Sequence, residues 1–336
     1  MRSIVCVEPG RLERREVPAP EAAAGLVTVD IRAVGICGTD FHIFEGTHPF
    51  LAYPRIMGHE LCGVVVGGAE SPDLAPGTRV VVNPYITCGH CVACRKGKRN
   101  CCATLKCLGV HVDGGMCERI LLPEENLYPA NDLSVRDAAM IEFQAIGAHA
   151  VRRSEVKAGD RVLVVGAGPI GVGTGIFARL AGGDVTLMDL SEARLDVLAD
   201  RFGFRENIRA GADALAEIDR RTDGDRYDVV FDATGSARAM EGSFAYVASG
   251  GTLVFVGVRN ADITFSDPEF HRKEITLKAS RNAIRADFET VMAAVRGGLV
   301  PMDALNTHAG TLDDLPEAMP AWMEGVELPL KAVVTV

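Results

Sequence analysis

The sequence predicts an α/β protein of two domains, a small β-rich N-terminal domain and a domain with a doubly wound parallel sheet. Three observations support this prediction. The chain has 336 residues, which is long enough for two hydrophobic cores. Short β-branched runs separated by turns fill its first third. From Asp160 onward, strands alternate with helices.

Composition and charge narrow the class of protein. Hydrophobic residues make up 48% and charged residues 24%, as in ordinary globular chains. The formal net charge of −10 argues against a basic nucleic-acid-binding face and against a polybasic membrane surface. No apolar run approaches the roughly 18 residues of a membrane helix, and the N-terminus shows no signal-peptide pattern. We therefore expect a cytoplasmic protein with no nucleic-acid or membrane partner.

Short strands define the first domain. The β-branched run 26–34 follows a stretch punctuated by proline and glycine, and 61–67 and 79–83 continue the pattern around the turn 76–78. Residues 331–336 form a further apolar strand at the other end of the chain. Without long helical patterns between them, these strands favour a small β-rich domain.

Donors that suit a catalytic zinc ion lie between the first two of these strands. Cys37, His59 and Glu60 would supply a thiolate, an imidazole and a carboxylate, and leave one position open for water or substrate. Thr39 could place its hydroxyl near a bound alcohol, and His42 could carry the proton onward. The alternative is a buried cysteine, a core histidine and a surface glutamate that share no ligand.

Four of the ten cysteines form a C-x2-C-x2-C-x7-C pattern. Four thiolates suit a closed, tetrahedral structural zinc site, and an iron–sulfur cluster or unlinked cysteines are the alternatives. With no export signal in the sequence, clustered thiols indicate a metal rather than disulfides. Because Cys101 adjoins the last position, spacing alone does not choose between the two neighbours. The pattern comprises Cys88, Cys91, Cys94 and Cys102.

A helical pattern covers residues 134–150, with Ser134 as the N-cap and Asp137 in the first turn. Glu142 lies inside this pattern among apolar neighbours. A buried carboxylate needs a partner, and the metal is one candidate. An exposed face of the helix is the other interpretation.

The second domain opens with a strand, a glycine-rich turn and a helix. Residues 161–165 form an apolar run typical of a buried parallel strand, and the helix continues to about residue 180. The next strand, 184–188, ends at Asp189. This order of elements is the context in which a G-x-G-x-x-G pattern indicates a dinucleotide site. The turn comprises Gly166, Ala167, Gly168, Pro169, Ile170 and Gly171.

This arrangement predicts the contacts of the cofactor. The glycines would let the backbone approach a pyrophosphate at the helix N-terminus. Asp189 would accept hydrogen bonds from the ribose hydroxyls and repel a 2′-phosphate, which favours NAD over NADP. We also expect Arg194 to contact the cofactor. Further strands and helices then alternate, which implies the doubly wound sheet: strands 227–232, 251–257 and 275–279, and helices 191–203, 237–247 and 284–297.

These signals, in this order, resemble the zinc-dependent medium-chain alcohol and polyol dehydrogenases over essentially the whole chain. The resemblance implies a GroES-like catalytic domain over 1–148, completed by 283–336, and a Rossmann NAD-binding domain over 149–282. It implies one catalytic and one structural zinc ion, and it favours zinc over iron–sulfur for the cysteine pattern. It also implies a homo-oligomer, either a dimer or a tetramer.

The chain has Glu60 and, at position 142, an acid in place of a cysteine. In this combination it resembles the sorbitol and threonine dehydrogenase branch. Three segments of the sequence resemble the bacterial L-galactonate 5-dehydrogenase group more closely: residues 53–60, 109–118 and 146–153. Relatives usually have proline after the acid equivalent to Glu142, whereas this chain has Phe143-Gln144. This departure bears on how Glu142 is aimed.

The resemblance implies NAD-dependent oxidation of a secondary alcohol on a polyol or a sugar acid. Zinc would lower the pKa of the substrate oxygen, Thr39 would pass the proton toward His42, and a hydride would move to the nicotinamide. A sorbitol- or threonine-type dehydrogenase is one alternative, and a zinc- and nucleotide-binding regulatory or structural protein is another. Residues expected to line the cofactor cleft are Thr234, Gly235, Gly257, Val258, Arg281 and Asn282.

Charge adds two expectations about the zinc site. Cys37, Glu60 and Glu142 would bring three negative charges to a divalent ion, so one glutamate is expected to swing away when substrate arrives. A sugar-acid substrate would also need a cation away from the zinc. The candidates are Arg55, Lys106 and Arg281.

Overall fold

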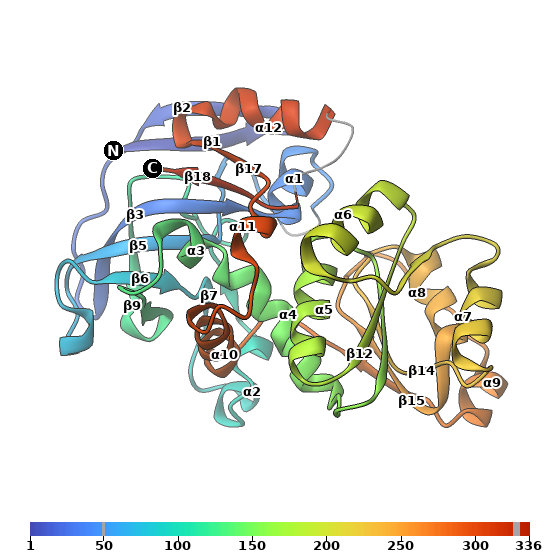
Figure 1. The fold of residues 1–336 in the computed structure, drawn as a ribbon. Helices are drawn as coiled ribbons and strands as arrows, with labels where there is room; N and C mark the ends of the chain where they lie inside the picture. Colours follow the sequence, from blue (N-terminus) through green and yellow to red (C-terminus); the bar gives the residue numbers. More distant parts are fainter. Residues whose placement is uncertain (49–50, 325–329) are drawn as a thin grey trace. The chain divides into compact units, whose positions relative to one another are not determined.

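The computed structural model describes residues 1–48, 51–324 and 330–336 (Figure 1). The chain divides into two compact units, Met1–Glu142 with Met292–Val336, and Phe143–Val291. Helices α4 (Ile141–Ser154) and α10 (Arg285–Arg296) each cross a border between these units. The domain boundaries expected from the sequence, 1–148 with 283–336 and 149–282, stay a prediction. None of the helices in the described ranges is long and apolar enough to cross a membrane.

A mostly antiparallel sheet is the framework of the first unit. Its described strands follow the order β10-β6-β5-β3-β18-β17, and β9 also pairs with β3. Strand β18 pairs with β3, so residues 332–335 join a sheet with strands from the first third of the chain. The strands are β3 (Leu26–Ile36), β5 (Glu60–Gly67), β6 (Arg79–Val82), β9 (Arg119–Pro123), β10 (Leu127–Pro129), β17 (His308–Thr311) and β18 (Ala332–Thr335).

Smaller elements surround this sheet. Strands β1 (Arg2–Glu8), β2 (Arg11–Glu16) and β4 (Arg55–Ile56) form a second sheet, and β7 (Tyr85–Ile86) pairs with β8 (Lys106–Cys107). In Figure 1 the helix α12 lies along β2, where Arg14 forms an ion pair with Glu317. The helices are α1 (Gly38–Phe44), α2 (Val92–Arg95), α3 (Val135–Ala139), α11 (Met302–Leu305) and α12 (Leu315–Glu324).

The second unit is built on a parallel sheet. The described strands follow the order β13-β12-β11-β14-β15-β16, and every neighbouring pair is parallel. Numbered from β11, this is the 3-2-1-4-5-6 order of a doubly wound dinucleotide-binding sheet, which confirms the predicted fold class. The strands are β11 (Arg161–Val165), β12 (Asp184–Asp189), β13 (Asn207–Arg209), β14 (Tyr227–Asp232), β15 (Val247–Phe255) and β16 (Thr276–Ala279).

Helices of this second unit connect the strands. They are α5 (Pro169–Leu180), α6 (Glu192–Phe202), α7 (Ala214–Thr222), α8 (Ala237–Ser243) and α9 (Asp267–Arg272). Apolar side chains from the sheet and the helices form its core, with Leu163, Val230 and Leu253 completely buried. This packing holds the carboxyl ends of β11, β14 and β15 in fixed register.

Two local predictions differ from the structure, and one short helix was not expected. Helix α1 follows Cys37 directly, and its seven residues are too few to show a helical period. The single helix expected over 134–150 is interrupted at Met140, whose backbone (φ −95°, ψ 9°) leaves the helical region. The helix expected over 237–247 ends at Ser243, since Val247 already pairs with Tyr227 in the sheet.

Candidate metal centres and cofactor loop

Three donor side chains meet where β3 ends and β5 begins. Gly35 is paired with Glu60 across the two strands, which brings Cys37 and His59 together beyond that pair. One ligand atom from each of Cys37, His59 and Glu60 lies within 4.8 Å of the other two. His59 and Glu60 are buried and Cys37 is half-buried. We call these three residues the mixed-donor cluster.

The surroundings of this cluster fit a cation. Among the described residues, His59 Nδ1 is buried without a hydrogen-bond partner, as expected of a nitrogen that binds a metal ion. Burial lowers the pKa of His59, but the neighbouring Cys37 and Asp40 raise it more, so this pKa lies well above its usual value. Negative groups around a buried imidazole therefore favour positive charge here.

A buried aspartate fixes the start of α1 beside the cluster. Asp40 Oδ2 accepts a hydrogen bond of 2.9 Å from the Cys37 N–H, and Asp40 Oδ1 has no partner among the described residues. The carboxylate of Asp40 is fully buried. Burial raises its pKa, whereas the charge of His59 lowers it. Asp40 thus supports the backbone of a donor residue and adds negative potential near the cluster.

Lys331 contacts the mixed-donor cluster, although no motif in the sequence pointed to it. Its Nζ donates hydrogen bonds to Oε1 (2.7 Å) and Oε2 (2.8 Å) of Glu60 and to the carbonyl of Ile36 (3.1 Å). Lys331 is 1% exposed, so this is a buried ion pair. The signal was a single lysine at the start of the apolar run that forms β18.

This lysine changes the charge balance expected from the sequence. Three negative groups were counted around a divalent ion, and on that basis one glutamate was expected to swing away. The buried ammonium of Lys331 compensates the Glu60 carboxylate directly. Charge alone therefore no longer requires a glutamate to leave, and the swing stays a prediction without its original reason.

Glu142 lies in the first turn of α4 and is 1% exposed. The hydroxyl of Tyr85, from β7, donates a hydrogen bond to Glu142 Oε1. Glu142 Oε2 has no partner in the part of the chain that the structure describes. Burial raises the pKa of Glu142, and the charges of His59 and Glu60 also act on it. Glu142 is not part of the group within 4.8 Å, so its role as a metal ligand stays a prediction.

The remaining polar residues predicted for the reaction occupy varied environments. Thr39 is half-buried in the first turn of α1, and the side chain of His42 is 62% exposed. His42 Nδ1 lies 3.3 Å from Thr47 Oγ1 and 3.4 Å from Glu45 Oε2. Arg55, a candidate for a substrate carboxylate, already forms an ion pair of 3.0 Å with Asp113. Lys106 is exposed on β8.

The four-cysteine pattern forms a second group of donors, which we call the cysteine lobe. Sulfur–sulfur distances of 3.5 Å join Cys88 to Cys102 and Cys91 to Cys94, and 4.0 Å joins Cys88 to Cys94. Four Zn–S bonds of about 2.3 Å in a tetrahedron place the sulfurs about 3.8 Å apart, so the lobe fits a zinc ion. Cys101 is exposed and lies outside the group that the described residues form.

Backbone hydrogen bonds prepare this lobe for a metal. The N–H groups of His90 and Cys91 lower the pKa of Cys88 to about 6. These hydrogen bonds thus favour the thiolate form of Cys88, which is the form that binds metal. All four donors of the lobe are cysteine sulfurs, and they come from one short segment of the chain.

The glycine-rich turn has the form of a phosphate-binding loop. Gly166 has φ +94°, and a Cβ on Gly171 would lie 1.7 Å from the Gly166 carbonyl, so both positions require glycine. A Cβ on Gly168 would meet no described atom within 4 Å, so the N-terminus of α5 is open to a ligand. Pro169 is at the first position of α5, followed by the half-buried Ile170.

Asp189 is tied to this turn by its carboxylate. Oδ2 accepts a hydrogen bond of 2.7 Å from the Ala167 N–H, and Oδ1 accepts one of 2.9 Å from the Ser191 N–H. The N–H of Arg194 is bonded to Ser191 Oγ (3.2 Å), which places Arg194 in the first turn of α6 near this acid. The acid and the glycine turn thus form one local structure.

The turns after β14 and β15 lie beside the glycine turn. A Cβ on Gly166 would be 3.0 Å from Thr234 Cγ2, and one on Gly257 would be 2.5 Å from the Gly235 N atom. These contacts lie at the carboxyl ends of β11, β14 and β15, where doubly wound sheets bind their ligands. Arg281 is exposed on the same unit, after β16.

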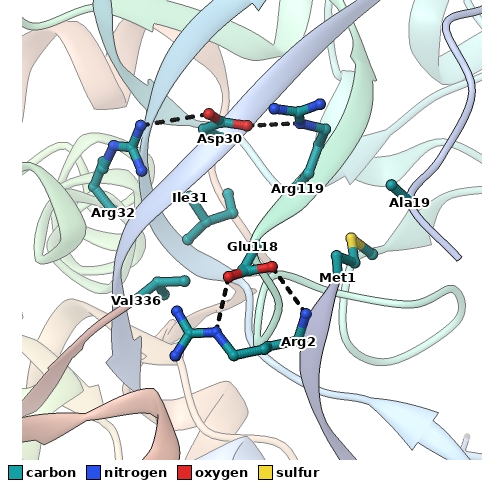
Figure 2. A pocket seen from close by; sticks show the side chains of 9 residues that line it. All are labelled: Met1, Arg2, Ala19, Asp30, Ile31, Arg32, Glu118, Arg119 and Val336. Carbon is teal, nitrogen blue, oxygen red and sulfur yellow. Dashed lines mark hydrogen bonds and ion pairs between the residues drawn. The ribbon is translucent and has the colours of Figure 1, made fainter. Parts of the chain in front are cut away.

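A hollow of about 370 Å³ in the first unit is not a candidate active site (Figure 2). Its guanidinium groups are already matched by carboxylates: Asp30 pairs with Arg32 and Arg119. Arg2 likewise pairs with Glu118 and Asp313. Because each guanidinium group of the hollow is already paired with a carboxylate, none of them is left to select an anionic ligand.

Comparisons with known proteins agree with this geometry. Residues 23–132 match the family model of the alcohol dehydrogenase GroES-like domain, and residues 169–296 match that of zinc-binding dehydrogenases. The chain is 42% identical over 311 residues to the L-galactonate-5-dehydrogenase of Escherichia coli (strain K12), covering 92% of this chain and 91% of that protein.

Solved structures extend the comparison. The alcohol dehydrogenase RspB of Escherichia coli CFT073, solved with NADH, is 29% identical and matches with a TM-score of 0.92 over 100% of this chain and 99% of that one. A zinc-binding dehydrogenase of Sinorhizobium meliloti 1021, bound to NADP, is 28% identical with a TM-score of 0.88 over 100% and 99%. Both nicotinamide cofactors therefore occur among similar structures.

Proposed function

The chain belongs to the zinc-dependent medium-chain alcohol dehydrogenases, and from that premise we propose that it oxidises a secondary alcohol of a sugar acid with NAD as the hydride acceptor. The observation that carries the proposal is the mixed-donor cluster of Cys37, His59 and Glu60 in a chain that also has the open glycine turn. Similarity to an L-galactonate-5-dehydrogenase supports the choice of a sugar acid.

The residues of the first unit divide the work of the reaction. Cys37, His59 and a carboxylate would hold the zinc ion, which when bound supplies a Lewis acid that lowers the pKa of a substrate hydroxyl. Thr39 would accept the proton of that hydroxyl and pass it toward His42. The side chain of His42 is 62% exposed, so it can release the proton to water.

The preference for NAD rests on Asp189. A 2′-phosphate would approach a carboxylate whose oxygens already hold the turn through Ala167 and Ser191, and like charges repel. We therefore expect kcat/KM with NAD to exceed that with NADP by a factor on the order of 10² or more, about 2.7 kcal/mol. Equal use of the two cofactors would contradict the role given to Asp189.

A substrate panel tests the sugar-acid proposal. Aldonates are compared with their matching neutral polyols by following NADH formation and measuring kcat/KM for each pair. We expect the aldonates to be preferred. Preference for the neutral polyols would reject the sugar acid and favour a sorbitol-type activity within the same family. If no compound of the panel supports NADH formation, the proposed function itself is rejected.

We also propose a homo-oligomer, a dimer or a tetramer, in the cytoplasm. Among the described strands β16 lies at the edge of its sheet, and its Leu277 is 39% exposed. An edge strand with an exposed leucine is a site at which a second copy can pair. The mass of the purified protein in solution, measured by light scattering, tests this assembly, and a monomer would contradict it.

A further inference from the structure

Tyr85 is held firmly beside the mixed-donor cluster although it belongs to none of the motifs that predicted the site. In β7 it pairs with Cys107 of β8. Its N–H donates to Asn83 Oδ1 (3.1 Å), and its carbonyl accepts from Asn126 Nδ2 (3.1 Å). Asn126 is 2% exposed. A half-buried asparagine and a buried one thus hold the Tyr85 backbone on both sides.

The Tyr85 hydroxyl meets a carboxylate that is only half satisfied. It donates to Glu142 Oε1, and both residues are buried, at 6% and 1% exposure. Within the described ranges Glu142 Oε2 has no partner. A buried carboxylate oxygen left in this state is unfavourable unless a donor or a cation completes it. The free oxygen is therefore open to a cation or to a further hydrogen-bond donor.

The two buried glutamates have partners of different kinds. Both oxygens of Glu60 accept hydrogen bonds from the ammonium group of Lys331, which cancels its charge. Glu142 instead accepts from a neutral phenol, which orients the carboxylate and leaves its charge in place. A phenol is neutral at ordinary pH, so the Tyr85 hydroxyl can donate its proton to this hydrogen bond.

We propose that Tyr85 is a positioning residue of the catalytic metal site. Its hydroxyl holds Oε1 of Glu142, and Oε2 is thereby kept available to the ion that Cys37 and His59 would bind. This inference rests on the metal site of the proposed function but not on the identity of the substrate. On this inference, the orientation of the Glu142 carboxylate is set by a hydrogen bond from Tyr85, which lies in the β7–β8 pair.

The test uses the full-length protein with cobalt in place of zinc at the mixed-donor cluster. Tyr85→Phe keeps the ring and removes the hydroxyl. We expect the dissociation constant for cobalt at the cluster to rise roughly 10- to 100-fold, as happens when residues that hold metal ligands are removed. The visible absorption bands of the bound cobalt should also shift. Metal in the cysteine lobe should be unaffected.

A matched control is Tyr227→Phe in the second unit. Tyr227 is 3% exposed, and its hydroxyl is hydrogen-bonded to Thr186, so the change also removes one buried phenol hydroxyl. It should leave both the cobalt affinity and the spectrum unchanged. An unchanged cobalt affinity and spectrum in Tyr85→Phe would overturn the inference.

Glu142→Ala shows whether Tyr85 acts through the glutamate. The double variant with Tyr85→Phe should bind cobalt as Glu142→Ala does, because the phenol then has no carboxylate to hold. It also removes the buried charge that Tyr85→Phe leaves unpaired, so it remains measurable if the single variant folds poorly. A further loss of affinity in the double variant would contradict the proposal. None of these readouts needs substrate, so failure of the substrate panel would reject the proposed function alone.

Discussion

The cysteine lobe and the mixed-donor cluster differ in how they are assembled. The lobe takes four identical donors from 15 consecutive residues, Cys88 to Cys102, and needs little beyond its own backbone. The mixed-donor cluster takes three different donors from the ends of β3 and β5 and depends on Lys331, 271 residues from Glu60. Four thiolates that fill every ligand position suit a structural zinc ion. A mixed set of three donors that leaves one position open suits a catalytic zinc ion.

The two regions also differ in how buried their donors are and in what stabilises the charges of those donors. Thiols in the lobe are half-buried except Cys102, and backbone N–H groups are enough to favour a thiolate at Cys88. In the mixed-donor cluster the charges themselves are buried, so each needs a designated partner. We therefore expect changes in the lobe to affect mainly stability, and changes around the cluster to affect mainly metal affinity and turnover.

The largest effect should come from breaking the lobe. Cys94→Ser removes one of its thiolates, and structural zinc contributes directly to folding, so we expect the melting temperature to fall by roughly 10 °C or more. Turnover per folded molecule should stay within about twofold of the parent, or roughly 0.4 kcal/mol. Cys101→Ser is the control, since Cys101 lies outside the group. A stable Cys94→Ser protein without turnover would reverse the assignment of the two regions.

Cys37→Ala should produce the opposite result. Loss of a ligand removes Lewis-acid assistance worth several kcal/mol, so turnover should fall by a factor on the order of 10³ or more. Thermal unfolding should change little. The control is Cys62→Ala, which removes a completely buried thiol of β5 outside the cluster. If both alanine variants lose turnover equally, burial of the thiol and not metal binding explains the effect.

Lys331→Met tests whether the cluster needs its buried cation. Removing one partner of a buried ion pair leaves Glu60 uncompensated, at a cost of about 3–5 kcal/mol in the free energy of unfolding of the metal-free protein. The cost should be smaller with zinc bound, because the ion then compensates Glu60. Lys273→Met is the control, since Lys273 is also buried but donates to the Val247 carbonyl (2.8 Å). Chemical denaturation with and without metal measures both, and an equal cost in the two states would contradict the compensation.

The smallest effect expected concerns the space beside Glu60. A Cβ on Gly35 would lie 2.4 Å from Glu60 Oε2, so Gly35→Ala must displace that carboxylate. We expect the metal affinity of the cluster to fall roughly tenfold, with the lobe unaffected. Gly67→Ala, at the other end of β5, is the control, because its Cβ meets no described atom within 4 Å. Unchanged metal affinity in Gly35→Ala would show that the position of Glu60 is not critical.

The same comparison explains what the sequence could predict. The lobe was predictable because Cys88 to Cys102 are neighbours in the chain, and the parallel sheet because its apolar runs and glycine turn recur in order. Cys37, His59 and Glu60 were indicated by residue types and a family resemblance. Lys331 and Tyr85 were not, because strand pairing and the direction of single hydrogen bonds bring them to the cluster. The interruption at Met140, which places Glu142 in the first turn of α4, likewise left no periodic signal.

The pairing of β18 with β3 also has a consequence for protein synthesis. Glu60 leaves the ribosome 271 residues before Lys331. At roughly 5–20 residues per second, that interval is about 14 to 54 s. During this time the β3–β5 pair carries an acid that has no ammonium partner. The nascent chain therefore cannot close this part of its core until β18 arrives, which couples the synthesis of this strand to the maturation of the metal site.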